Sequence, residues 1–496
     1  MKILVLQLAR LGDILQTWPT VRALTRDGHD VSLAVRPRFK AAIEGLDSVR
    51  NVHFFETRQY LEPIFNLQMG GVPEAMRQLD RFFESIVSER YDMVINLSFS
   101  SLSSWICHEL ECRSGGQILV KGYSRHSDGA LSIPDDTSAY FYAQVGIGRP
   151  NRIPITHLFA SIAGVDLVEA DWARPAFLKL EHRSPENGYP NVLVHIGASE
   201  GHKSFSSRDW VAVLNQAVQQ TAHDSIQFGL VGSAEEAERG EAIATELSEL
   251  GFGDRVTSYV GRTTFKELWS LASRADLILG GDSVMAQMAP LVGVPMLNMS
   301  TPTVSHWETG PLSRGSRIVI VDGDLATDPL MCDRIARELA AMIKHSEISS
   351  ADRVVGGPIE ALSEIEQTEV WLLVKAIYMG GAWPVRPELE PLWKAWSDLA
   401  DIEEEQTQVL LSGRGERRAI AELLNQIDGI TDGLAAESQW AAVLADWWKT
   451  ERLRVPPGTI EETSHRFLEI NRQLKNALQN LRLEHGVNDD GPLVEL

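Results

Sequence analysis

The 496-residue sequence has only three cysteines and no hydrophobic run approaching the length of a membrane-spanning helix. A bilayer requires roughly 18 consecutive apolar residues, whereas the apolar start of this chain soon meets Arg10 and Asp13. That start also lacks the small-residue cleavage site of a signal peptide. Cys107, Cys112 and Cys332 form an odd, sparse set that makes no disulfide framework. These absences predict a cytoplasmic protein without a transmembrane segment.

The spacing of the cysteines also argues against a metal site. Cys107 and Cys112 flank His108, but their five-residue spacing on a predicted helix places the two sulfurs on different faces. Zinc sites usually use Cys-x-x-Cys-like spacing and four ligands. We therefore expect buried or half-buried thiols and no bound metal.

Basic residues are scarce. The chain has 46 Lys and Arg against 68 Asp and Glu, a net charge of −22, which excludes a general nucleic-acid-binding surface. Residues 1–180 carry 19 basic and 20 acidic side chains, whereas residues 181–350 carry 13 and 22, and residues 351–496 carry 14 and 26. Only the first third is therefore suited to an anionic partner, since the rest would be repelled by an acidic lipid surface.

Strand and helix patterns alternate over the first 345 residues, which predicts an α/β protein with parallel sheets and helical crossovers. The expected strands are Met1–Leu8, Val31–Val35, Met93–Leu97, Asn191–His195, Gln227–Val231, Arg255–Tyr259, Leu277–Leu279, Pro295–Asn298 and Arg317–Val321. Helices are expected at Asp13–Thr25, Ser207–Thr221 and Phe265–Arg274. The chain is too long for one core, so we predict doubly wound domains at 1–165 and 166–349 with a ligand cleft between them.

After about residue 350 the pattern becomes helical, which predicts an all-α extension over 350–496. Seven of the 13 tryptophans fall there. Adjacent Trp447 and Trp448 are expected to pack in a helical core, although a carbohydrate platform or membrane anchor is an alternative. The amphipathic stretch Glu461–Glu484 is a candidate oligomerisation or partner helix.

The turn after the first predicted strand carries Arg10-Leu11-Gly12-Asp13. A dinucleotide-binding turn would have several glycines here, so this one is not expected to cradle a pyrophosphate. It presents the carboxylate of Asp13 at the start of a helix, at the mouth of the expected cleft. The residue could be a functional carboxylate or an acid favoured by the helix dipole.

Two later turns are suited to an anion. In residues 195–210, Lys203 lies in a small-residue turn before a helix, where an ammonium group and free N–H groups could neutralise phosphate. A solvated surface lysine is the alternative, and Arg208 is expected on the surface. In residues 277–297, two glycines precede Asp282 and Ser283 at a helix start, so the backbone can approach a ligand closely. Asp282 could equally be a plain N-cap.

Together these three turns resemble glycosyltransferase family 9, the ADP-heptose:lipopolysaccharide heptosyltransferases. The first turn continues to Pro19 as in the family pattern, and the middle block matches His-x-Gly-Ala-Ser with Lys203 in place, although Phe205 replaces a tryptophan. The last block keeps Asp282 and Ser283, whereas Val284 replaces a glycine and Gln287 a histidine. The resemblance covers residues 1–345.

The resemblance implies a GT-B fold, in which two Rossmann-like domains face each other, and an inverting, metal-independent glycosyltransferase without a cofactor. Asp13 would be the general base. The donor, favoured as ADP-heptose, would contact Lys203, Gly281, Asp282, Ser283, Val284 and Gln287, with Gly197, Ser199 and Thr301 as further candidates. Candidates for acceptor binding are Arg10, Gly12, Arg36, Arg38 and Lys40.

The sequence does not identify the acceptor. A lipopolysaccharide core or other surface glycan would place the enzyme in the cytoplasm, at most in peripheral contact with the inner face of the inner membrane. A protein acceptor docked by the helical extension is an alternative, as is an inactive scaffold that binds a nucleotide sugar. A homo-oligomer through the C-terminal helices is a further expectation.

Overall fold

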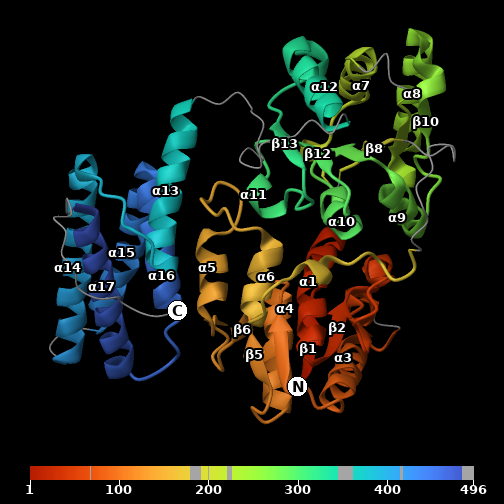
Figure 1. Ribbon diagram of the computed structural model, residues 1–496. Coiled ribbons are helices and arrows are strands. Elements are labelled where there is room, and N and C mark those ends of the chain that lie inside the picture. Colours follow the sequence, from red (N-terminus) through yellow and green to blue (C-terminus); the bar gives the residue numbers. More distant parts are fainter. Residues whose placement is uncertain are drawn as a thin grey trace. The chain divides into compact units, whose positions relative to one another are not determined.

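The computed structural model describes residues 1–66, 69–178, 191–198, 200–220, 226–343, 361–413 and 417–482 (Figure 1). The chain divides into two compact units, one of Met1–Asp92 with Ile153–Ile359 and the other of Met93–Arg152 with Glu360–Leu496. The predicted α/β fold with parallel sheets and C-terminal helices is confirmed. The predicted division at residues 165 and 349 stays a prediction.

The first unit begins with parallel strands β1 (Lys2–Leu6), β2 (Asp30–Val35) and β3 (Val52–Phe54). β1 is an almost continuous apolar run and is buried, as strands covered on both faces are. Helix α1 (Leu11–Arg26) follows directly and packs against α6 (Ile155–Ala163), while α2 (Thr57–Phe65) packs against α3 (Gly71–Val87). The short turn between β1 and α1 therefore lies at the carboxyl end of a buried strand.

The same unit contains a six-stranded parallel sheet in the order β10-β9-β8-β11-β12-β13. The strands are β8 (Val192–His195), β9 (Phe228–Val231), β10 (Val256–Ser258), β11 (Leu277–Gly280), β12 (Met296–Ser300) and β13 (Arg317–Ile320). Its helices include α7 (Ser207–Gln220), α8 (Ala237–Leu247), α9 (Phe265–Arg274), α10 (Val284–Val292), α11 (His306–Thr309) and α12 (Pro329–Ile343). The strand order reverses between β8 and β11, which is where ligands bind in such sheets.

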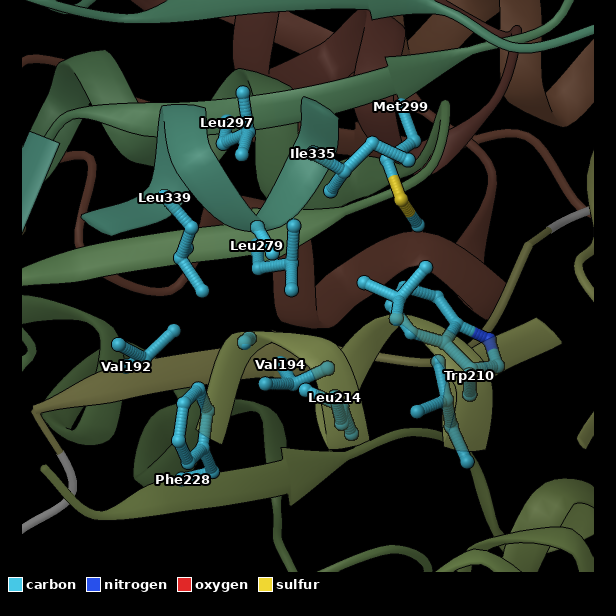
Figure 2. Close-up of a cluster of buried hydrophobic side chains, with 14 of the residues drawn as sticks. Val192, Val194, Trp210, Leu214, Phe228, Leu279, Leu297, Met299, Ile335 and Leu339 are labelled. Atoms are coloured by element: carbon cyan, nitrogen blue, oxygen red, sulfur yellow. The ribbon is translucent and has the colours of Figure 1, made fainter. Parts of the chain in front are cut away.

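The core of this sheet is formed by apolar strand residues and two covering helices. Figure 2 shows Trp210 and Leu214 of α7 and Ile335 and Leu339 of α12 beside side chains of the central strands. The labelled strand residues are Val192, Val194, Phe228, Leu279, Leu297 and Met299, and all are buried. This packing fixes β8 and β11 and thereby the turns at their carboxyl ends.

The second unit joins residues 93–152 to the C-terminal helices. Its early elements are β4 (Met93–Asn96), α4 (Ser101–Arg113), β5 (Leu119–Lys121), the hairpin β6 (Ser124–Arg125) and β7 (Leu131–Ser132), and α5 (Asp136–Gln144). The late ones are α13 (Ala361–Met379), α14 (Glu390–Leu411), α15 (Arg417–Glu437), α16 (Gln439–Leu453) and α17 (Ile460–Arg482). Helix α5 packs on α16, and Arg454 donates to Asp136 Oδ1 at 2.6 Å. The extension thus packs on a segment more than 200 residues earlier in the chain.

Five of the seven tryptophans of the helical region pack in its core, as expected, whereas Trp371 and Trp383 are partly exposed. Trp393, Trp396, Trp440 and Trp448 are at most 4% exposed, and Trp447 is 9% exposed. Helix α17 packs its apolar face along α14, so that face is used inside the chain. Its proposed role in oligomerisation stays a prediction, and residues 483–484 of the expected helix lie outside the described residues.

The cysteines differ in part from expectation. Cys107 is buried, but Cys112 on the same helix is exposed, with its Sγ 3.6 Å from His108 Nε2, so the expectation of a buried or half-buried thiol is wrong for Cys112. The five-residue spacing turns it to the outer face of α4.

In the part of the chain that the structure describes, no helix has the length and apolarity needed to cross a bilayer. Within the same residues, no three side chains of the types that bind metals lie close enough together to hold an ion.

A buried ion pair lies inside the helical region. Glu403 of α14 is fully buried, and Arg452 Nη2 of α16 lies 3.1 Å from its Oε1. Arg452 also lies over the rings of Trp448 and Phe467, at 4.7 and 5.1 Å from their centroids. Burial raises the pKa of Glu403, while the charge of Arg452 opposes that rise. Breaking such a pair leaves an uncompensated buried charge.

We predict that Arg452→Met lowers the free energy of unfolding by about 3 to 5 kcal/mol in urea titrations at neutral pH. The deficit should shrink at acid pH, because a protonated Glu403 needs no cationic partner. Lys449→Met is the matched control on the same helix, since its partner Asp432 is 74% exposed, and should cost at most about 1 kcal/mol. Equal losses in the two variants would contradict this account.

Candidate functional site

The three turns singled out in the sequence meet at one open pocket of about 480 Å³ in the first unit. Arg10, Gly12 and Asp13 line it from the turn after β1, Lys203 lines it from the turn after β8, and Asp282 to Val284 line it with Gln287 from the start of α10. Arg38, Phe39, Glu200 and Thr309 are also in its lining. Helix α1 packs against α10, which brings these segments together.

The remaining predicted residues are placed differently. Among the described residues, Arg36, Lys40, Gly197, Gly281 and Thr301 do not line this pocket. Lys40 is exposed, and Arg36 lines a second pocket described below. Ser199 lies outside the described residues. Whether any of these residues contacts a ligand stays a prediction.

Asp13 lies at the helix start and in the pocket lining, and its role as a functional carboxylate stays a prediction. It is the third residue of α1, and its Oδ2 accepts a hydrogen bond of 2.9 Å from the backbone N–H of Arg10, so it caps the helix start. It also lines the pocket. Burial raises its pKa, and the hydrogen bond from Arg10 and the charges of Arg10 and Lys203 partly oppose that rise. A carboxylate with a raised pKa is a better proton acceptor near neutral pH.

Glu200 forms ion pairs with two of the cations that line the pocket, Lys203 and Arg10. Its Oε2 lies 2.6 Å from Lys203 Nζ, and its Oε1 lies 2.8 Å from Arg10 Nη2. The hydrogen bond from Arg10, followed by that from Lys203, lowers the pKa of Glu200 to about 2. Glu200 was not among the residues predicted from the sequence. Its position three residues before Lys203 was the available signal, but its pairing with Arg10 depends on tertiary structure.

Arg239 of α8 supports the loop that carries Glu200 and Lys203. It donates to the carbonyl of Ile196 at 2.6 Å and to Ser204 Oγ at 2.8 Å, which lie on either side of the turn. Its Nη2 also donates to Glu236 Oε1 at 2.9 Å. A Cβ at Gly197 would lie 2.4 Å from Glu236 Oε2, so a larger residue there would displace the carboxylate that pairs with Arg239. Arg239 was not predicted either, because nothing near the loop in the chain indicates it.

The turn between β11 and α10 is built around Asp282. Its Oδ1 accepts from Asn298 Nδ2 at 3.0 Å, and its Oδ2 accepts from Ser300 Oγ at 3.1 Å and from the N–H of Thr301 at 3.0 Å. Burial raises its pKa against these hydrogen bonds. Ser283 caps α10, and its neighbour Val284 lines the pocket, so the positive end of this helix lies at the pocket wall.

Gln287 and Gly281 shape the same wall. The Nε2 of Gln287 donates to the carbonyl of Thr309 at 2.6 Å, which fixes its amide at the pocket. A Cβ on Gly281 would lie 3.3 Å from the ring of Phe205, so Gly281 accommodates that aromatic residue. Phe205 stands where the family pattern has a tryptophan, and it is buried.

A second pocket of about 520 Å³ is lined by Arg36, Arg38 and Arg58 together with Leu61 and Phe65. Arg38 lines both pockets. Phe65 is 83% exposed, and Ile64, Met69, Val72 and Met76 of the same region are exposed as well. The same lining includes Glu56 and Glu62, so a pocket with three arginines and two glutamates, beside exposed apolar side chains, adjoins the first pocket.

Known proteins resemble this chain in sequence and in fold. The model of "Glycosyltransferase family 9 (heptosyltransferase)" matches residues 79–328, a stretch that includes Lys203 and Asp282 but not Asp13. The E. coli heptosyltransferase WaaC with ADP is 14% identical, with a TM-score of 0.50, and the match covers 69% of this chain and 100% of that chain. At this identity the likeness supports the fold.

Two further solved structures are similar at lower TM-scores. E. coli ADP-heptose lps heptosyltransferase II is 17% identical over 70% of this chain and 100% of that chain, with a TM-score of 0.46. The family 9 glycosyl transferase of Veillonella parvula is 10% identical over 70% and 97%, with a TM-score of 0.48. A search of curated proteins found no match.

We predict that Asp282→Ala lowers the free energy of unfolding by about 1 to 3 kcal/mol, because it leaves the three donors around this carboxylate without their acceptor. Urea titration measures this, and Asp282→Asn, which keeps one acceptor oxygen, should cost less. The control Asp322→Ala removes an exposed carboxylate after β13 and should cost no more than about 0.5 kcal/mol. If Asp282→Ala lowers the free energy of unfolding no more than the control does, the hydrogen bonds to Asp282 do not stabilise the fold.

Proposed function

Since the chain belongs to glycosyltransferase family 9, we propose that it transfers heptose from ADP-heptose to a hydroxyl of a lipopolysaccharide-core or related surface-glycan acceptor. The family makes it a glycosyltransferase with a nucleotide-sugar donor and a glycan acceptor. The observation that carries the finer proposal is that Asp13 and Lys203 line one pocket. The same observation disfavours an inactive scaffold, since both reactive groups are in place.

Asp13 is proposed as the general base. An acceptor hydroxyl becomes an effective nucleophile when a positioned carboxylate takes its proton, which contributes about 10² to 10⁴ to the rate. The hydrogen bond from the N–H of Arg10 fixes the carboxylate, and burial raises its pKa toward the working range. Direct attack of the activated oxygen on the anomeric carbon, opposite the departing diphosphate, would invert the configuration.

Lys203 and the start of α10 are proposed to stabilise the leaving group. As the bond from the sugar to oxygen breaks, negative charge develops on the β-phosphate, and preorganised donors at that position lower the barrier. Lys203 supplies an ammonium group, and the helix beginning at Val284 supplies the positive end of its dipole. Gln287, fixed by Thr309, is proposed to contact the sugar.

Lys203 and the positive end of α10 support a mechanism in which no metal ion stabilises the departing diphosphate. The chain does contain an Asp-x-Asp pair, Asp322-Gly323-Asp324, after β13, but neither aspartate is among the described residues that line the pocket. Asp324 instead accepts from the N–H of Ala326 and caps a 3₁₀ turn. The oxygens of Asp282 are both used as hydrogen-bond acceptors from the protein.

The second pocket supports a glycolipid acceptor over a protein acceptor. Its three arginines outnumber its two glutamates and suit anionic groups, while exposed Leu61 and Phe65 suit an apolar part. Residues 1–92 carry 12 basic and 12 acidic side chains in a chain of net charge −22. We therefore propose that the enzyme works in the cytoplasm, with this pocket directed at an acceptor on the inner face of the membrane.

We predict that Asp13→Asn lowers kcat for sugar transfer by about 10² to 10⁴, while ADP binding is kept. The amide oxygen can still accept from the N–H of Arg10, so the helix start should be preserved. Asp27→Asn, at the exposed end of the same helix, is the control and should leave kcat unchanged.

The pH profile gives a second measure of the same variant. In the wild type, kcat/KM should fall as the pH drops through the pKa of Asp13, which burial places above the ordinary value of about 3.9. The Asp13→Asn enzyme should lack this acid limb. Transfer at the wild-type rate by this variant would show that the base is another group.

A further inference from the structure

Glu200 occupies the position between two cations that would otherwise meet an anionic ligand. Arg10 belongs to the turn after β1 and Lys203 to the turn after β8, and the Arg10–Glu200 pair is 190 residues apart in sequence. One carboxylate oxygen contacts each cation, at 2.8 and 2.6 Å. All three residues line the pocket of Asp13. The pocket therefore contains its own bridging anion.

A phosphate group can make the same contacts as this carboxylate. It also presents two or more anionic oxygens to an ammonium and a guanidinium group. The side chain of Lys203 is 17% exposed and that of Glu200 is 32% exposed, so their attraction is screened only in part by solvent. A diphosphate that reaches Lys203 must therefore replace Glu200 as its partner or share the ammonium with it.

We propose that Glu200 is a positioning residue that substitutes for the donor's diphosphate in the free enzyme and releases Lys203 to it on binding. This proposal rests on the proposed function, because it takes the ligand to be a nucleoside diphosphate sugar. In the free enzyme, Glu200 keeps Lys203 at the pocket and connects it to Arg10. When the diphosphate binds, Lys203 exchanges one anionic partner for another, and Arg10 remains paired with Glu200.

Breaking the Lys203–Glu200 pair costs free energy when the diphosphate binds, so a variant without this pair should bind the diphosphate more tightly. Glu200→Gln removes the negative charge but keeps an oxygen that can accept from Arg10, and Arg239 still holds the loop at Ile196 and Ser204. A purely structural role for Glu200 would make the variant bind more weakly. The exchange makes it bind more tightly, so the direction of the change separates the two roles.

The test is isothermal titration of the full-length protein with ADP at low and high salt. Glu200→Gln should lower the Kd for ADP by about threefold to tenfold and steepen its salt dependence. Lys203→Ala should then weaken ADP binding more in the Glu200→Gln background than in the wild type. Glu74→Gln is the matched control. Glu74 also pairs with two arginines, Arg77 and Arg81, but lies on α3 outside the pocket lining, so its loss should leave the Kd unchanged.

Other outcomes would overturn the proposal in distinguishable ways. Unchanged or weaker ADP binding by Glu200→Gln, with the wild type binding ADP, refutes the exchange and leaves the proposed function intact. Binding of neither ADP nor pyrophosphate by the wild type and the variant refutes both. Equal effects of Lys203→Ala in the two backgrounds show that Lys203 and Glu200 act independently, which also refutes the exchange.

Discussion

Parallel pairing of β8 with β11 is the constraint on which the pocket depends. His195 at the end of β8 is in register with Gly280 at the end of β11, although 85 residues separate them in the sequence. The two turns that follow, one with Lys203 and the other with Asp282 and Ser283, therefore lie at the same edge of the sheet. Packing of α1 against α10 then adds the turn that carries Asp13. Any change that separates β8 from β11 would disperse the site without altering one of its side chains.

Much of this architecture was predictable from apolar patterning. The expected strands lie within a residue or two of their observed positions, and α9 spans Phe265–Arg274 as expected, because long buried runs and helical spacing are local signals. The site residues Asp13, Lys203 and Asp282 were predictable because each follows a strand. Glu200 and Arg239 were not, since their contacts join segments with no shared local pattern. The packing of 93–152 with the C-terminal helices was unpredictable for the same reason.

Asp13 and Asp282 show how one carboxylate serves fold and site together. Each is half-buried, each accepts hydrogen bonds that hold its turn, and each lines the pocket. The alternatives considered for them from the sequence, capping and function, are therefore compatible. The two carboxylates differ in the hydrogen bonds that their oxygens accept. Asp282 uses both oxygens to hold β12 and the following turn, whereas Asp13 uses Oδ2 for the N–H of Arg10 and is the proposed proton acceptor.

The most direct test of the account is a crystal structure of the wild-type protein with ADP bound. We expect the β-phosphate oxygens to lie within about 2.7 to 3.2 Å of Lys203 Nζ and of N–H groups at the start of α10, in the pocket lined by Asp13. A diphosphate bound elsewhere, or bound in this pocket without contact to Lys203 or to α10, would contradict it.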